Sequence, residues 1–123
     1  MSVYKIKNSN LTIYSADTFF QRLKGLLGRR ELEQNEALHI RPCNHVHTIG
    51  MRYDLDIVFL DIEGNVLKVD SLGPNQWAFC RSAKTVLEFR SGCARLHGYD
   101  QLFRKCTRLA TKDFVLKSIS DRL

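Results

Sequence analysis

The stretch that begins at Cys43 brings a thiol and two imidazoles close to the most apolar run of the chain. Cys43, His45 and His47 occupy alternate positions, so an extended backbone would direct all three side chains to one face. Thiolate and imidazole are ligands that zinc and similar cations prefer. One hypothesis is therefore a divalent transition-metal site made by these three residues, with Cys80 or Asp56 as the fourth ligand.

A structural interpretation of the same residues is favoured over the metal site. Cys-x-His-x-His is not a recognised metal motif, and buried cysteine is common in protein cores. His47 would then bond a strand edge, His45 would be solvated, and Cys43 would fill the core. A nucleophilic thiol also lacks the local signature of known cysteine hydrolases. A metal- or thiol-dependent enzyme using Cys43, His45, His47 and Cys80 is thus the alternative hypothesis, and the sequence leans against enzymatic activity.

Asp54 and Asp56 form a second candidate pair. They are two residues apart, so they share one side of an extended strand, and paired carboxylates can serve as acid and base. A buried carboxylate, however, must be paired or hydrogen-bonded, because the bare ion is very costly to desolvate. The sequence therefore predicts Asp56 as a buried anchor, bonded to backbone amides or to Arg52.

The main hypothesis for function is a non-enzymatic ligand- or protein-binding accessory module, with no cofactor. Polar residues cluster around the apolar run without a complete catalytic set. The residues predicted to line its polar pocket are His47, Thr48, Met51, Arg52, Asp56, Trp77 and Arg81.

Length and charge limit the classes of protein that remain. The 123 residues suit a single domain, residues 1–123, and the chain is basic, with 19 Lys and Arg against 13 Asp and Glu. The cations are scattered and no nucleic-acid-binding motif is present, which argues against nucleic acid. Binding of nucleic acid through the basic segment 103–123 is the second alternative. Without a signal peptide or a membrane span, we expect a cytoplasmic protein with reduced cysteines.

Alternating apolar residues predict a mostly antiparallel sheet. The strand at residues 55–60 is apolar on both faces, with Leu55, Ile57 and Phe59 on one side and Asp56, Val58 and Leu60 on the other, which indicates an interior strand. The strand at 66–70 is predicted to form a hairpin with 55–60. The other predicted elements are a hairpin or two short strands within residues 4–14, a helix at 18–27, strands at 37–40 and 85–89, an irregular segment at 71–83, a short helix at 92–97 and a strand at 114–116.

With these motifs in order, the chain resembles the family of domains of unknown function numbered 192. The segments that carry the resemblance are Arg22-Leu23-Lys24-Gly25-Leu26-Leu27-Gly28-Arg29, Pro42-Cys43, His47-Thr48, Met51-Arg52, Leu55 to Asp61, Val86-Leu87-Glu88 and Gly98 with Asp100. They lie in a family-like core of about 11–102, and the His47-Thr48 pair is similar to one branch of the family. The resemblance implies a small α+β fold with a barrel-like sheet and one or two short helices packed on it. It implies no activity, cofactor or catalytic residue.

Overall fold

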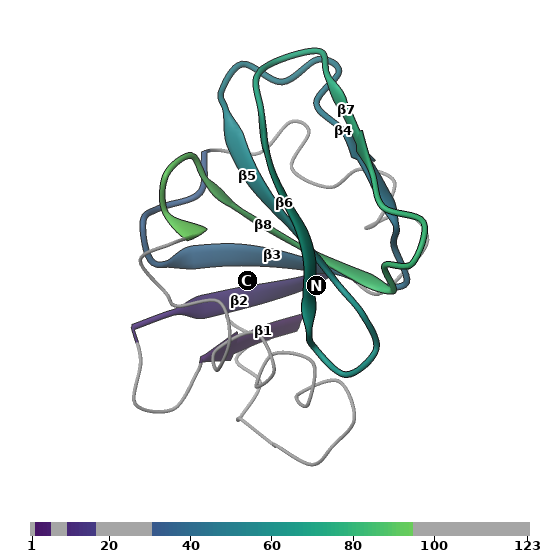
Figure 1. The fold of residues 1–123 in the computed structure, drawn as a ribbon. Helices are drawn as coiled ribbons and strands as arrows, with labels where there is room; N and C mark the ends of the chain where they lie inside the picture. The colour runs from purple at the N-terminus through teal and green to yellow at the C-terminus, as the bar shows by residue number, and fades with distance from the viewer. Residues whose placement is uncertain (1, 6–9, 17–30, 95–123) are drawn as a thin grey trace.

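Eight strands form the described part of the chain, residues 2–5, 10–16 and 31–94, in this computed structural model (Figure 1). They are β1 (Ser2–Lys5), β2 (Thr12–Ala16), β3 (Glu36–Ile40), β4 (His45–His47), β5 (Leu55–Leu60), β6 (Val66–Leu72), β7 (Trp77–Phe79) and β8 (Thr85–Arg90). Six of them make a main sheet in the order β1-β2-β3-β8-β5-β6. β4 and β7 pair separately as a two-stranded ribbon. Every pairing is antiparallel except that of β2 with β3.

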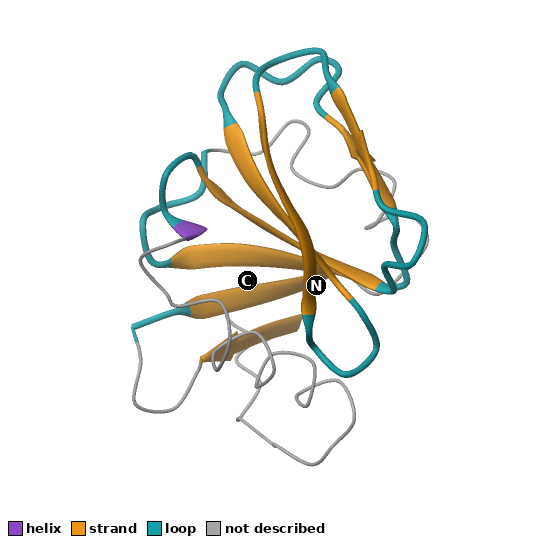
Figure 2. Ribbon diagram, viewed as in Figure 1, coloured by secondary structure: helices purple, strands orange, loops and turns teal. Residues whose placement is uncertain are grey.

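The predicted α+β class and barrel-like sheet are wrong. Over the described ranges, helical backbone occurs only at Ala94, and strands and loops make up the rest (Figure 2). The main sheet is open, with β1 and β6 at its two edges. The sequence could not show whether the sheet closes into a barrel, because an interior strand is apolar on both faces in a barrel and in a covered open sheet alike. The helix predicted at 18–27 and the strand at 114–116 lie outside the described residues, as do residues 95–97 of the short helix predicted at 92–97.

The prediction for β5 is confirmed. β5 pairs with β8 on one side and with β6 on the other, so it is an interior strand, and all six of its residues are buried. Its side chains divide between two apolar clusters as the alternation requires. Leu55, Ile57 and Phe59 belong to one cluster, and Val58 and Leu60 to the other.

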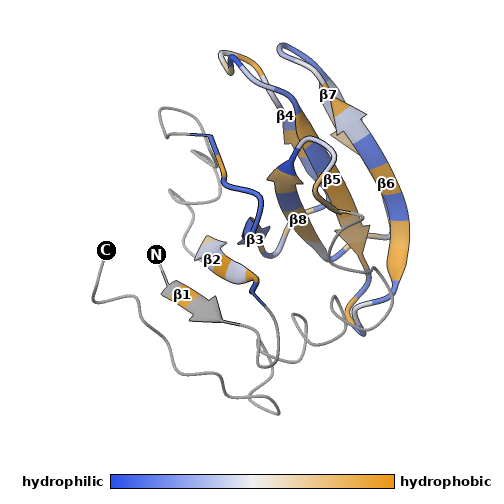
Figure 3. Ribbon diagram, turned by 90° about the vertical axis from the view of Figure 1, so that its left-hand side faces the viewer, coloured by the Kyte–Doolittle hydropathy of each residue, from blue (hydrophilic) through white to orange (hydrophobic). Residues whose placement is uncertain are grey.

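The remaining strand predictions are largely confirmed. β1 pairs with β2, and β5 with β6, as the two predicted antiparallel hairpins. β3 and β8 lie at the predicted strands 37–40 and 85–89. Figure 3 shows polar and apolar residues alternating along the edge strand β6. Two strands were missed: β4 was not among the predicted elements, and β7 lies in the segment predicted to be irregular.

The turn between β5 and β6 is held by the side chain of Asp61. Its Oδ1 accepts the backbone N–H groups of Glu63 and Asn65, each at 2.9 Å, and its Oδ2 accepts the Asn65 side-chain amide at 3.0 Å. Slight desolvation would raise the pKa of Asp61, but hydrogen bonds from Asn65, Glu63 and Gly64 together lower it below its usual value. Gly64 takes a positive φ of 85° there, a conformation that glycine adopts without strain.

The β4–β7 ribbon packs over one face of the main sheet and closes the larger apolar cluster. This cluster, here called the inner core, joins Val46 of β4 and Ala78 of β7 to residues of the main sheet. Its members from the main sheet include Leu38, Ile40, Leu55, Ile57, Phe59, Leu72 and Val86. The second cluster lies on the opposite face and includes Leu11, Ile13, Val58, Leu60, Leu87 and Phe89. The ribbon is therefore a second layer that hydrophobic burial holds on the sheet.

Among the described residues, no helix has the length and hydrophobicity that a membrane crossing requires.

Candidate functional site

The ribbon presents one buried and one exposed face. The register pairs His45 with Phe79, Val46 with Ala78 and His47 with Trp77. Val46 and Ala78 point inward and are each only 6% exposed. Because side chains alternate along a strand, the two histidines and two aromatic rings all lie on the outer surface. We call His45, His47, Trp77 and Phe79 the aromatic–histidine face.

Backbone hydrogen bonding brings each histidine close to its aromatic partner. The amide of Cys80 donates to the Asn44 carbonyl and that of Thr48 to the Gln76 carbonyl, each at 2.9 Å. These bonds place the two histidine–aromatic pairs at the non-hydrogen-bonded positions of the ladder, where opposed side chains approach most closely. The rings of His47 and Trp77 accordingly lie 5.1 Å apart between centroids, tilted by 50°.

The aromatic–histidine face is unusually open to solvent. Trp77 is 63% exposed and Phe79 55%, and neighbouring Ile49 is 46% exposed. Large aromatic rings left in water forgo most of the free energy that their burial would supply. Adjacent exposed rings of this kind are typical of surfaces that bind a partner.

The ribbon is tied at one end by Thr48, which is buried. Its hydroxyl donates to the Gly73 carbonyl at 2.6 Å and accepts the backbone N–H of Gln76 at 2.9 Å. His47 is held from the same end, because the Ile49 amide donates to its Nδ1 at 3.3 Å. That bond leaves Nε2 of the neutral ring as the nitrogen that carries the proton.

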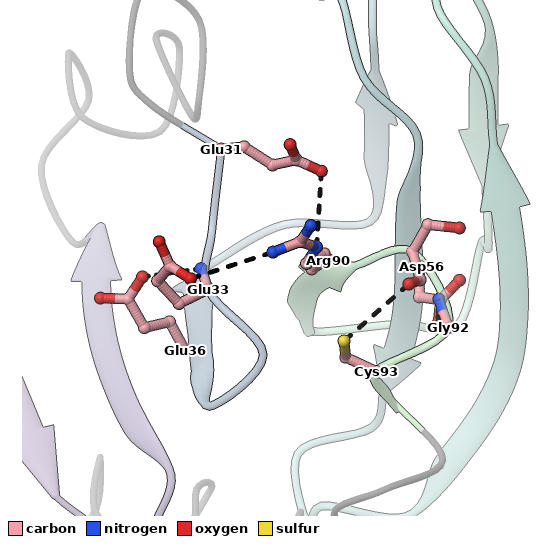
Figure 4. A network of polar contacts seen from close by, with 8 residues as sticks. Glu31, Glu33, Glu36, Asp56, Arg90, Gly92 and Cys93 are labelled. Atoms are coloured by element: carbon pink, nitrogen blue, oxygen red, sulfur yellow. Dashed lines mark hydrogen bonds and ion pairs between the residues drawn. The ribbon is translucent and has the colours of Figure 1, made fainter.

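Asp56 lies apart from the other predicted pocket residues. It shares the face of β5 that carries Val58 and Leu60, whereas the ribbon covers the opposite face. Its Oδ2 accepts the backbone N–H groups of Gly92 at 2.9 Å and Ala94 at 3.3 Å, and Ser71 donates to its Oδ1. Figure 4 shows Asp56 beside Gly92. The carboxylate is thus bonded to backbone amides, as predicted for an anchor, and a pocket shared by His47 and Asp56 is not formed.

The other predicted pocket residues surround the ribbon. Met51 is partly buried against the inner core, while Arg52 is exposed. Arg81 follows β7 directly after Cys80 and is also exposed. The structure therefore brings His47, Thr48 and Trp77 together. Arg52 and Arg81 are exposed, a few residues along the chain from Thr48 and Trp77.

The residues of the alternative metal site divide between the two faces of the ribbon. Cys43 and Cys80 pack against the inner core, whereas His45 and His47 belong to the outer face. The expectation that Cys43 shares a face with the histidines does not hold, because β4 begins only at His45. The Cys43 thiol instead donates to the His45 carbonyl at 3.0 Å. In the part of the chain that the structure describes, no three His, Cys, Asp or Glu residues gather in a group that could hold a metal ion.

Two buried ionisable residues were not singled out from the sequence. Cys93 lies beside Asp56 (Figure 4); desolvation raises the pKa of its thiol, Arg90 opposes the rise, and Asp56 and Glu31 add to it. A raised pKa keeps the thiol protonated and poorly nucleophilic. Glu88 is buried between strands in the middle of the main sheet, and its burial raises the pKa to about 8. The burial of neither residue was predicted, and Glu88 was named only within the segment Val86-Leu87-Glu88 that carries the family resemblance.

The sequence matches one family model over most of its length. The family model of DUF192, described as "Uncharacterized ACR", matches residues 3–101. The chain belongs to the DUF192 family. The resemblance predicted from its motifs is therefore confirmed, and no curated protein matches the chain.

Two solved structures share the fold of this DUF192 protein. One, from Sinorhizobium meliloti 1021 and provisionally named as a transcription regulator, is 20% identical with a TM-score of 0.63, over 70% of this chain and 73% of that one. The other, a protein of unknown function from Novosphingobium aromaticivorans DSM 12444, is 21% identical with a TM-score of 0.61, over 76% and 73%. At these identities the likeness concerns the fold alone.

Proposed function

We propose that this DUF192 protein is a non-enzymatic binding module that engages a ligand or partner protein through the aromatic–histidine face. The observation that carries the proposal is the pair of exposed rings, Trp77 at 63% and Phe79 at 55%, on one side of a well-tied ribbon. Exposed aromatic residues on a rigid support are enriched among the residues that dominate binding free energies.

The polar groups around the face support binding rather than chemistry. The Thr48 hydroxyl is committed to Gly73 and Gln76, and one nitrogen of His47 is committed to Ile49. What remains on the face is largely aromatic area, together with the second ring nitrogen of His47 and that of His45, whose Nδ1 contacts the Asn44 side-chain oxygen at 3.1 Å. Such a surface supplies apolar contact and a few polar ring nitrogens, which suits recognition.

Site-specific photocrosslinking in living cells tests the proposal. The photoreactive residue p-benzoylphenylalanine would be placed at the ribbon in Phe79→p-benzoylphenylalanine. The matched control is Ile62→p-benzoylphenylalanine, because Ile62 is an apolar residue in the β5–β6 turn that is 68% exposed, more than Phe79 at 55%. We expect discrete crosslinked adducts from position 79 and few from position 62. Equal adduct yields at the two positions would contradict the proposal.

A further inference from the structure

The two chain segments that carry the aromatic–histidine face contain charged side chains of one sign only. Residues 41–53 contain β4 and residues 71–87 contain β7, and neither segment has an aspartate or glutamate. Their charged side chains are Arg41, Arg52, Arg81 and Lys84. A surface with aromatic rings and only cations on its own segments fits an anionic partner.

The cations next to β7 are available to a ligand. Arg81 and Lys84 are exposed, and no acidic residue in the described part of the chain forms an ion pair with either. Lys68 of β6 also approaches the ribbon, with its Nζ donating to the Phe79 carbonyl at 2.9 Å. Its charge is shared with Asp70, whose carboxylate lies 3.0 Å away, so Lys68 mainly holds the edge of β7. The free positive charge thus lies just beyond Phe79.

The spacing of the rings suits planar partners. Trp77 and Phe79 are two residues apart on one strand, so their rings lie on the same side at a separation of about 7 Å along the backbone. Bases of a single strand stack on exposed aromatic rings while their phosphates contact nearby Lys and Arg. A duplex hides the faces of its bases within the stack, so it could not use these rings in this way.

We propose that the aromatic–histidine face binds single-stranded nucleic acid, with bases stacked on Trp77 and Phe79 and phosphates at Arg81 and Lys84. This rests on the proposed function, since it names the partner of the same face. It differs from binding through the basic segment 103–123, because it assigns the contact to the ribbon.

Fluorescence offers a direct measurement, because Trp77 is the single tryptophan of the chain. The full chain would be titrated at 50 mM salt with a twelve-residue oligouridylate and a twelve-residue oligothymidylate, and separately with a DNA duplex. We expect base stacking to quench Trp77 on addition of a single strand and much less on addition of duplex. A twelve-residue oligoglutamate serves as a polyanion without bases, and no comparable quenching is expected from it.

Variants assign the interaction to particular side chains, with binding followed by anisotropy of a labelled oligonucleotide. We expect Trp77→Ala to weaken binding at least about fivefold and Trp77→Phe to retain most of it, since phenylalanine also stacks. Arg81→Ala with Lys84→Ala should reduce the salt dependence. For two phosphate contacts, one at Arg81 and one at Lys84, affinity in the unaltered chain should fall about sevenfold between 50 and 200 mM salt. The matched control, Ile62→Ala, should bind as the unaltered chain does.

The outcomes distinguish a failure of the nucleic-acid proposal from a failure of the proposed binding function. No binding of either single strand at 50 mM salt, or binding that Trp77→Ala and Phe79→Ala leave unchanged, overturns the nucleic-acid assignment. Equal binding of oligoglutamate overturns it as well. If crosslinked protein adducts still arise at position 79 in any of these cases, the binding module stands with a protein partner. If those adducts are missing too, both proposals fail.

Discussion

The carboxylate of Asp56 links three parts of the chain through hydrogen bonds. It lies on β5, accepts the hydroxyl of Ser71 on β6, and accepts the amides of Gly92 and Ala94 beyond β8. Asp56→Ala would leave the buried amide of Ala94 without an acceptor, so we expect a loss of about 2–3 kcal/mol in the free energy of unfolding. Urea denaturation measures this loss.

Asp54 supplies the matched control for this prediction. It is an aspartate two residues earlier in the chain, but it is exposed, and its side chain makes no hydrogen bond within the described part of the chain. Asp54→Ala should therefore change the free energy of unfolding by no more than about 0.5 kcal/mol. If Asp56→Ala were as mild as Asp54→Ala, the role of Asp56 as an anchor would be refuted.

Individual residues could be predicted from sequence where a physical cost forces one solution. A carboxylate in an apolar strand must find donors, so the bonding of Asp56 to backbone amides followed from its position. The solvent exposure of Trp77 could not be predicted in this way, because a single tryptophan is more often buried. Phe79 was missed altogether. The pattern of two aromatic residues around Ala78 covers only three residues, which is too short to indicate a strand.

At the scale of elements, the hydroxyl of Thr48 decides how firmly the ribbon closes. It donates to Gly73 and accepts from Gln76, so it joins the end of β4 to the turn that precedes β7. Thr48→Val keeps the shape but removes both bonds, and we expect a loss of about 1–2 kcal/mol in the free energy of unfolding. The amides of Thr48 and Cys80, which bond across the ribbon, should exchange with deuterium faster.

Thr48→Ser tests whether the hydroxyl itself is responsible. Serine retains the donor and acceptor, so hydrogen exchange at the ribbon should stay close to that of the unaltered chain. If Thr48→Val showed unaltered exchange at Thr48 and Cys80, the hydroxyl would not be what holds the ribbon.

The strands of the main sheet were predictable because their apolar pattern is long enough. β5 and β8 each have six residues, and their buried positions follow a recognisable run. The ribbon was not predictable, since β4 and β7 have three residues each and pair across 30 residues of sequence. Short strands gain their stability from packing on a distant sheet, which local sequence does not record. The main candidate surface therefore came from the structure, although His47 and Trp77 were named beforehand.

At the scale of the whole molecule, closure and layering decide the fold class. The sequence specified interior strands apolar on both faces but not what covers them. In the structure, the ribbon covers one face of the main sheet and leaves the sheet open at β1 and β6. Family membership was predictable from motifs spread over most of the chain, because their order is more specific than any one of them.

Glu88 couples the stability of the whole molecule to pH. It lies on β8 opposite Leu38 of β3 and Ile57 of β5, and its Oε2 has no hydrogen-bond partner among the residues that the structure describes. Arg90, two residues further along, pairs with Glu31 and Glu33 instead (Figure 4). Burial therefore favours the neutral acid and raises the pKa of Glu88 from 4.5 to about 8.

The direction of the pH dependence follows from which state binds the proton. Between pH 4.5 and about 8 the folded chain keeps the proton on Glu88 and the unfolded chain has released it. The contribution of Glu88 to stability is thus full below pH 4.5 and is lost as the pH rises to about 8. Over this range the free energy of unfolding falls by at most about 1.4 kcal/mol per pH unit. Glu88→Gln cannot ionise, so urea denaturation across this range should show a flatter pH dependence. Exposed Glu63→Gln should keep the slope of the unaltered chain, and an equal slope in Glu88→Gln would show that Glu88 does not carry the effect.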